Sequence, residues 1–202
     1  METAAGPQSG AYPLQLDLSG PLTIERWRVV GNLILVIPHL IIAWALQSLL
    51  EALAVVAFIT ILFTGNIPRG LFKFMAMILR YTWRVTTYLL FMRESYPEFA
   101  FTPSELDPGT DQATFSIPYP DRLSRGLIFI KWLLVIPNLL VLCFVALAAA
   151  VELIIAWFAV LITGEWPEGM RRFVVGTIRW GTRVRAYLYL MTDEYPPFTT
   201  QP

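Results

Sequence analysis

The sequence predicts a mainly α-helical integral membrane protein made of two tandem copies of one unit. Of its 202 residues, 56% are hydrophobic and only 15% are charged, which is too apolar for an ordinary soluble domain. Two long stretches, 29–63 and 128–162, are almost free of charge. Glycine, proline and arginine positions recur at a spacing of 99 residues, as in Pro21 and Pro120, which indicates a tandem duplication.

Each copy is predicted to contain a short strand, a transmembrane helical hairpin, an amphipathic surface helix and a short C-terminal strand. Residues 1–11 are polar and without Lys or Arg, so they lack the features of a signal peptide and predict a disordered tail. The first membrane repeat covers 12–102 and the second covers 113–202. The linker 103–112 contains Pro-Gly and several acidic residues and predicts a solvated loop.

The first strand of each copy is predicted from alternation. Leu14, Leu16 and Leu18 alternate with polar residues, and the matching segment 115–119 alternates in the same way. Alternation with a period of two is typical of a half-buried strand. Because the two copies run in the same direction along the chain, we expect a pseudo-twofold axis along the membrane normal.

The two apolar stretches predict hairpins rather than single spanning helices. One straight helix over either stretch would measure roughly 52 Å, against about 30 Å of hydrocarbon. Lys and Arg flank both ends of each stretch, so the positive-inside rule places both ends in the cytoplasm. The hairpin tips are expected near 47–51 and 146–152, with both chain termini cytoplasmic and the protein multi-pass. A short re-entrant hairpin is the alternative.

A Thr-Gly-x-x-Pro-x-Gly motif follows each apolar stretch and predicts a corner. Glycine just past a helix end can adopt the left-handed conformation, and proline suits the first turn of the next helix. The expected corner residues are Gly65, Pro68 and Gly70 in the first copy and Gly164, Pro167 and Gly169 in the second.

The helix after each corner carries a stripe of basic residues on one face, with a tyrosine one turn beyond the last arginine. Such a stripe is suited to anionic lipid headgroups or to the carboxylates of a partner protein. Alternatively, the arginines pair with acids such as Asp17, Glu94 or Asp193 and only hold the helix in place. The candidate lipid- or partner-binding residues are Lys73, Arg80, Arg84, Tyr88, Arg172, Arg179, Arg183 and Tyr187.

Four of the polar residues inside the apolar stretches are singled out as candidates: His39, Asn138, Glu51 and Glu152. Polar groups at such positions are candidates for function. His39 follows Pro38, whose ring frees a backbone carbonyl, so a kink-stabilising role is favoured over a proton path or a haem ligand. Its counterpart Asn138 does not titrate. Glu51 and Glu152 are expected at hydrated hairpin tips.

Composition excludes several classes of function. The net charge is zero, which argues against a nucleic-acid partner. The chain has one cysteine, Cys143, and one histidine, so no metal site or cofactor is expected. The sequence contains no phosphate-binding loop, nucleophile elbow or zinc-protease motif, and we therefore expect no enzymatic activity.

Four motifs together resemble a known family. They are Arg-x(10)-Ile-Pro-His from Arg26, the corner motif, Arg-x-x-x-Arg-Val-x-x-Tyr, and Thr-Asp-x-Tyr-Pro-Pro-Phe from Thr192. The set is similar to the bacterial membrane-protein family numbered 4389 among the domains of unknown function. The second copy departs at Asn138, where the family favours His, and the first departs in its closing motif, with Arg93, Glu94 and Glu98. The resemblance implies a bacterial integral membrane protein with duplicated domains, and it implies no reaction.

Together these observations favour a non-catalytic accessory or scaffold subunit that packs against a larger membrane protein complex in the bacterial cytoplasmic membrane. A lipid-binding or lipid-handling protein that uses the arginine-striped helices is the alternative, with anionic membrane lipids as partners. A small channel or transporter is the third possibility.

Overall fold

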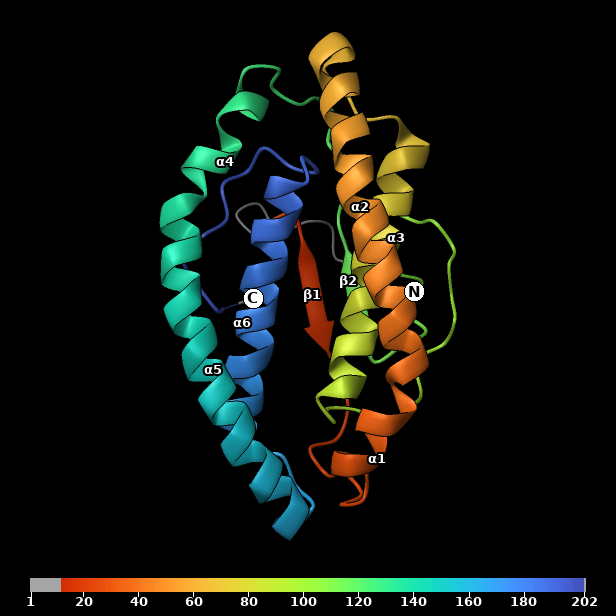
Figure 1. The fold of residues 1–202 in the computed structure, drawn as a ribbon, viewed down its shortest axis with the longest axis vertical. Helices are drawn as coiled ribbons and strands as arrows, with labels where there is room; N and C mark the ends of the chain where they lie inside the picture. Colours follow the sequence, from red (N-terminus) through yellow and green to blue (C-terminus); the bar gives the residue numbers. More distant parts are fainter. Residues whose placement is uncertain (1–11, 202) are drawn as a thin grey trace, which may run out of the picture.

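The computed structural model describes residues 12–201, so the tail expected at 1–11 lies outside the described residues. The chain is mainly helical and forms two similar halves that lie side by side (Figure 1). The first half contains β1 (Gln15–Leu18), α1 (Arg28–Leu35), α2 (Ile37–Thr64) and α3 (Arg69–Leu89). The second contains β2 (Ala113–Ser116), the 3-10 helix η1 (Leu127–Phe129), α4 (Lys131–Leu134), α5 (Ile136–Thr163) and α6 (Glu168–Leu188).

The two copies meet in a two-stranded antiparallel sheet. Leu16 of β1 lies opposite Phe115 of β2, and these two residues occupy the same position in their copies. Gln15 pairs with Ser116, and Asp17 pairs with Thr114. By the 99-residue spacing Gln15 is equivalent to Thr114 and Asp17 to Ser116, so the two pairs are equivalent to each other. The strands are therefore related by a pseudo-twofold axis that passes through the Leu16–Phe115 pair, perpendicular to the strands.

The predicted hairpins are wrong. α2 and α5 are each one continuous helix of 28 residues, and they pass without a turn through the expected tips at 47–51 and 146–152. Neither tip contains a glycine or proline; 47–51 contains two leucines and 146–152 contains four alanines, and both residue types favour helix. The apolar stretches are instead broken near their beginning, where α1 and α4 end just before Pro38 and Pro137.

Proline and glycine mark the ends of these helices. Pro38 and Pro137 lie in the first turns of α2 and α5, where their missing N–H groups cost no helical hydrogen bond. Gly65 and Gly164 follow the last turns with φ of +79°, the left-handed region that glycine adopts without strain. Pro68 and Pro167 then precede α3 and α6 directly.

The predicted surface helices are also wrong, because α3 and α6 are central. α3 packs against α2 and β2, while α6 packs against α5 and β1. Buried side chains on α3 therefore lie all round the helix, from Phe72 to Tyr88. The predicted C-terminal strands do not form at 100–102 or 199–200, and Thr200 instead accepts a hydrogen bond from Arg179.

α2 and α5 run in opposite directions along the long axis of the molecule (Figure 1). By length and composition, both are long and apolar enough to cross a membrane. Large apolar side chains are exposed along both, including Ile41 and Trp44 on α2 and Phe144 and Ile154 on α5. The helices touch the opposite copy near their ends, since Phe58 packs against Phe129 and α5 contacts α1.

Candidate functional site

Two arginines of the predicted stripe are buried in the first copy and share one carboxylate. Arg80 and Arg84 are each 5% exposed. The Nε of Arg80 and the Nη2 of Arg84 both lie 3.2 Å from Asp107 Oδ2. Asp107 belongs to the linker, so the linker is packed against α3 and the expected solvated loop is wrong at this residue.

The linker runs along the outer edge of β2. Asp107 accepts the backbone N–H of Phe115 at 3.0 Å, and Glu105 accepts that of Ile117 through its carbonyl at 3.2 Å. Asp111 accepts the N–H of Ala113 and pairs with Arg93. These contacts satisfy edge groups that would otherwise stay open to another chain.

The stripe has different partners in the second copy. Arg179 donates to Leu16 O at 2.8 Å and to Asp17 Oδ1 at 3.1 Å, but the Asp17 side chain is 66% exposed. Arg183 donates to Gln201 O at 3.1 Å, and its guanidinium stacks on the Tyr12 ring. Within residues 12–201, no carboxylate lies within ion-pair distance of Arg183, and its Nε has no hydrogen-bond partner.

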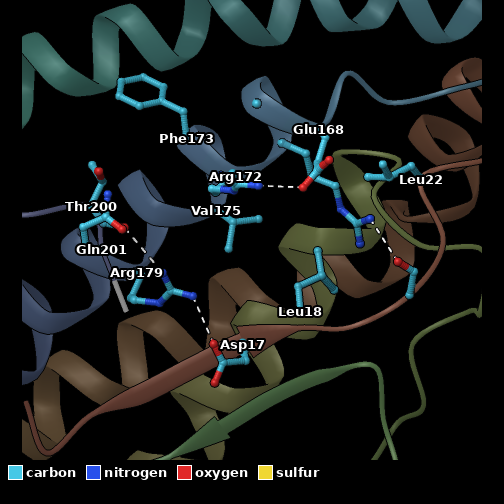
Figure 2. Close-up of a pocket in the computed structure, with 13 residues that line it drawn as sticks. Asp17, Leu18, Leu22, Glu168, Arg172, Phe173, Val175, Arg179, Thr200 and Gln201 are labelled. Atoms are coloured by element: carbon cyan, nitrogen blue, oxygen red, sulfur yellow. Dashed lines mark hydrogen bonds and ion pairs between the residues drawn. The ribbon is translucent and has the colours of Figure 1, made fainter. Parts of the chain in front are cut away.

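Three arginines line an open cavity of about 640 Å³ beside β1, which we call the basic pocket (Figure 2). Arg171 is held by the carbonyls of Gly20 and Pro21, and Figure 2 shows Arg172 paired with Glu168 and Arg179 lying between Asp17 and Thr200. The walls of the basic pocket are formed by α6, by the end of β1 with the loop that follows it, and by the C-terminal segment. The lining residues are Asp17, Leu18, Gly20, Leu22, Glu168, Gly169, Arg171, Arg172, Phe173, Val175, Arg179, Thr200 and Gln201.

The buried arginines of the two copies have different charged neighbours, and this affects their pKa values. Burial lowers the pKa of Arg80, and the neighbouring Asp107 raises it again. Burial also lowers the pKa of Arg183, and Arg179 lowers it further. Arginine nevertheless stays protonated in proteins, so both remain cations that need compensation.

The tyrosines of the predicted site, Tyr88 and Tyr187, pack against other side chains. Lys131 lies over the ring of Tyr187, and Tyr88 packs edge to face against Tyr96. Lys73 at the start of the stripe lies 3.9 Å from Glu105. Of the acids named as alternative partners, Asp17 pairs with Arg179, whereas Glu94 and Asp193 contact Arg28 and Lys131.

The polar candidates of the two apolar stretches lie apart from the basic pocket. His39 is fully buried, its Nδ1 lies 2.7 Å from the Tyr81 hydroxyl, and its ring stacks on Phe99. Asn138 accepts from Trp180 Nε1 at 2.6 Å and donates to Pro196 O at 2.7 Å. His39 thus connects α2 to α3, and Asn138 connects α5 to α6.

Glu51 and Glu152 lie on the continuous helices rather than at hairpin tips. Glu51 is exposed, and Glu152 is half-buried with no partner for its Oε2 among residues 12–201. No group of His, Cys, Asp or Glu in the described part of the chain could hold a metal ion.

The sequence reading missed the carboxylates that complete the first copy's network, Glu105, Asp107 and Asp111. Their signal was present as acidic residues spaced along the linker directly after an arginine-striped helix. Arg171 was also missed, because its counterpart in the first copy is Phe72 and the repeat therefore did not single it out.

The geometry defines a class of protein: a duplicated, mainly helical chain whose copies join through one strand pair. The family model described as Domain of unknown function (DUF4389) matches residues 26–101 and again residues 125–200. The chain belongs to this family and carries its domain twice, with the two matches 99 residues apart at both ends. No curated protein and no solved structure matches the chain.

Proposed function

We propose that this protein is a non-catalytic accessory or scaffold subunit of a membrane protein complex, attached to one leaflet by an apolar face formed by α2 and α5. The exposed apolar side chains of these two helices carry the proposal. A surface of this extent is typical of contact with lipid or with another protein. The finer assignment to the cytoplasmic side of a bacterial inner membrane rests on the positive charge beside both helix ends.

The contacts around α2 show where its apolar side faces. His39 touches Tyr81 of α3, while Gln47 contacts Tyr189 of the second copy. At 100° per residue, Gln47 lies about a quarter turn from His39. The exposed residues Ile41 and Ile59 lie about 160° from His39, on the side opposite α3.

The pseudo-twofold axis relates the exposed side of α2 to the exposed side of α5. The axis is perpendicular to the antiparallel helices and to the line that joins the two copies. In Figure 1 α2 lies in front of α3, so the direction from α3 to α2 has a component along this axis, and rotation about the axis leaves that component unchanged. The exposed sides of α2 and α5 consequently face the same way.

The chain beside α2 favours a helix that lies flat over one that crosses the bilayer. The Tyr96 hydroxyl donates to Leu35 O near the start of α2, and Leu123 N donates to Gly65 O at its end. The chain between residues 96 and 123, which contains no helix, thus runs from one end of α2 to the other. In a spanning arrangement this polar chain would lie at hydrocarbon depth, where irregular backbone exposed to lipid does not occur.

Depth measurements distinguish the two arrangements. Spin labels on single cysteines at positions 41, 48, 55 and 59, in a Cys143→Ala background, lie along one side of α2. In reconstituted vesicles we expect similar immersion at all four positions, because a flat helix keeps one depth. A label at exposed Thr102 is the control and should stay in water. A profile that is deepest in the middle of α2 and shallow at both ends would contradict the flat arrangement.

The accessory role predicts a partner in the native membrane. After extraction in a mild detergent, native mass analysis should find the chain in a stoichiometric complex with another membrane protein.

A variant with Ile59→Lys and Ile155→Lys should leave the membrane fraction, because both residues are about half exposed on the apolar face. Recovery of the wild-type chain only as a free monomer would argue against the accessory role.

One observation favours lipid binding as a second function. Arg122 and Arg125 lie beside Gly65 at the end of α2, and Arg26 lies beside Gly164 at the end of α5. Positive charge at both ends of an apolar face is suited to anionic headgroups. The stripe arginines contribute less to this role, because Arg80, Arg84, Arg179 and Arg183 are buried.

A further inference from the structure

The basic pocket has a counterpart in the first copy, and the chain itself fills that counterpart. The linker residues 104–107 lie there. Ile117 N donates to Glu105 O at 3.2 Å, Asp107 N donates to Ser116 Oγ at 3.0 Å, and Arg80 Nη2 donates to Ser104 O at 2.9 Å.

The residues that hold the linker have equivalents in the pocket. By the 99-residue spacing, Ser116 and Ile117 correspond to Asp17 and Leu18, while Lys73 and Arg80 correspond to Arg172 and Arg179. All four equivalents line the basic pocket. The second copy therefore presents the same kind of surface without a segment of residues 12–201 lying in it.

The backbone of β1 offers hydrogen bonds at the same place. Phe115 N–H points away from β1, because it donates to Asp107. Since Leu16 lies opposite Phe115, the pseudo-twofold directs the N–H groups of Leu16 and Leu18 away from β2. An extended segment can pair with a strand edge of this kind.

The side chains of the pocket select for negative charge. The Arg172 side chain is 73% exposed and pairs with the similarly exposed Glu168, so a carboxylate of a bound segment can take the place of Glu168. Arg179 already donates to Leu16 O, Thr200 O and Asp17 Oδ1 and adds positive charge to the wall of the pocket. Asp17 replaces Ser116, and its carboxylate can accept a backbone N–H as Ser116 Oγ does. The pocket thus matches a backbone with acidic side chains better than it matches an isolated anion.

We propose that the basic pocket binds an extended acidic segment of a partner protein, with carboxylates two residues apart as in Glu105 and Asp107. The inference rests on the proposed accessory role, because it names the chemistry of the partner surface. The chain's own linker provides the template for the bound segment.

The test uses the full chain in detergent micelles and a fluorescent peptide with the sequence of residues 104–111, Ser-Glu-Leu-Asp-Pro-Gly-Thr-Asp. Fluorescence anisotropy should show saturable binding. A control peptide with Gln and Asn in place of its acids should bind at least about tenfold more weakly, since it loses its charge-assisted hydrogen bonds.

Two matched variants locate the binding site. Arg172→Glu should weaken binding of the acidic peptide at least about tenfold, through loss of one charge pair and gain of a repulsion. Arg185→Glu makes the same change at an exposed position of α6 that does not line the pocket, and it should leave binding unchanged. Both variants should melt like the wild-type protein, because each side chain is exposed.

Four results would overturn the proposal: equal binding of the two peptides, no effect of Arg172→Glu, full displacement by inorganic phosphate at matched ionic strength, or displacement by phosphatidylglycerol vesicles that depends on Arg172. Binding that appears only after deletion of residues 1–11 would also overturn it, by identifying the chain's own N-terminal segment as the occupant. Flotation with vesicles, run on the same proteins, keeps failure of the peptide proposal separate from failure of membrane attachment.

Discussion

Replacement of Asp107 by alanine is expected to destabilise the protein by about 3–5 kcal/mol. The Asp107 side chain is 3% exposed and lies between Arg80 and Arg84, whose side chains are each 6% exposed. Its removal leaves Arg80 buried without an ion-pair partner among residues 12–201 and leaves Arg84 with Asp111 alone, at 3.6 Å. Removal of one partner of a buried ion pair is far more costly than loss of a surface pair. Unfolding by denaturant in detergent micelles, followed by circular dichroism, measures the change.

Glu168→Ala is the control for Asp107→Ala. Glu168 pairs with Arg172 at 2.6 Å, but the two side chains are 65% and 73% exposed. An exposed pair of this kind contributes about 0–1 kcal/mol. Equal and small losses for the two variants would mean that the linker is not needed to compensate the α3 arginines, and the template for the basic pocket would be lost with it.

Asn138→Ala is expected to cost about 2–6 kcal/mol, because it leaves two buried groups without partners at about 1–3 kcal/mol each. Asn138 is fully buried, and it connects α5 to Trp180 of α6 and to the carbonyl of Pro196. Trp180→Phe removes one donor only and should cost less. The same denaturation measurement applies, since both variants report on the packing of α5 against α6.

A double-mutant cycle with Asn138→Ala and Trp180→Phe tests whether the hydrogen bond itself is responsible. Residues in direct contact show non-additive losses, so the double variant should be less destabilised than the sum of the single ones. Ser48→Ala, at an exposed position of α2, is the control and should change stability little. Strict additivity would show that the two side chains act independently.

The repeat and the helix ends could be predicted from the sequence because they depend on local chemistry. Gly65 and Gly164 end their helices, and the alternation around Leu16 and Phe115 gives the paired strands. The hairpins could not be predicted correctly, since positive charge at both ends was interpreted as a return crossing. A helix that lies along a membrane surface also has both ends on one side, and charge alone does not separate the two cases.

The site was harder to predict because its partners are distant in sequence. The arginine stripe was visible as a helical pattern, and Asp17 was among the acids named for it. The pairing of Asp107 with Arg80 and Arg84 depends on the linker folding back onto α3, which no local pattern indicates. The basic pocket could be recognised only by comparing the two copies in the structure. The comparison shows that the linker fills the groove of the first copy, whereas the equivalent groove of the second copy is the basic pocket.

The strand pair across the pseudo-twofold axis bears on the ancestry of the chain. Leu16 and Phe115 are the same position of two copies, so the contact between the copies is self-complementary, as in a twofold homodimer. A chain with one copy has the same strand edge and can complete it only by pairing with a second molecule. The duplicated chain is thus equivalent to a homodimer whose two subunits are joined in one chain, and the joining segment packs into the groove of the first half only.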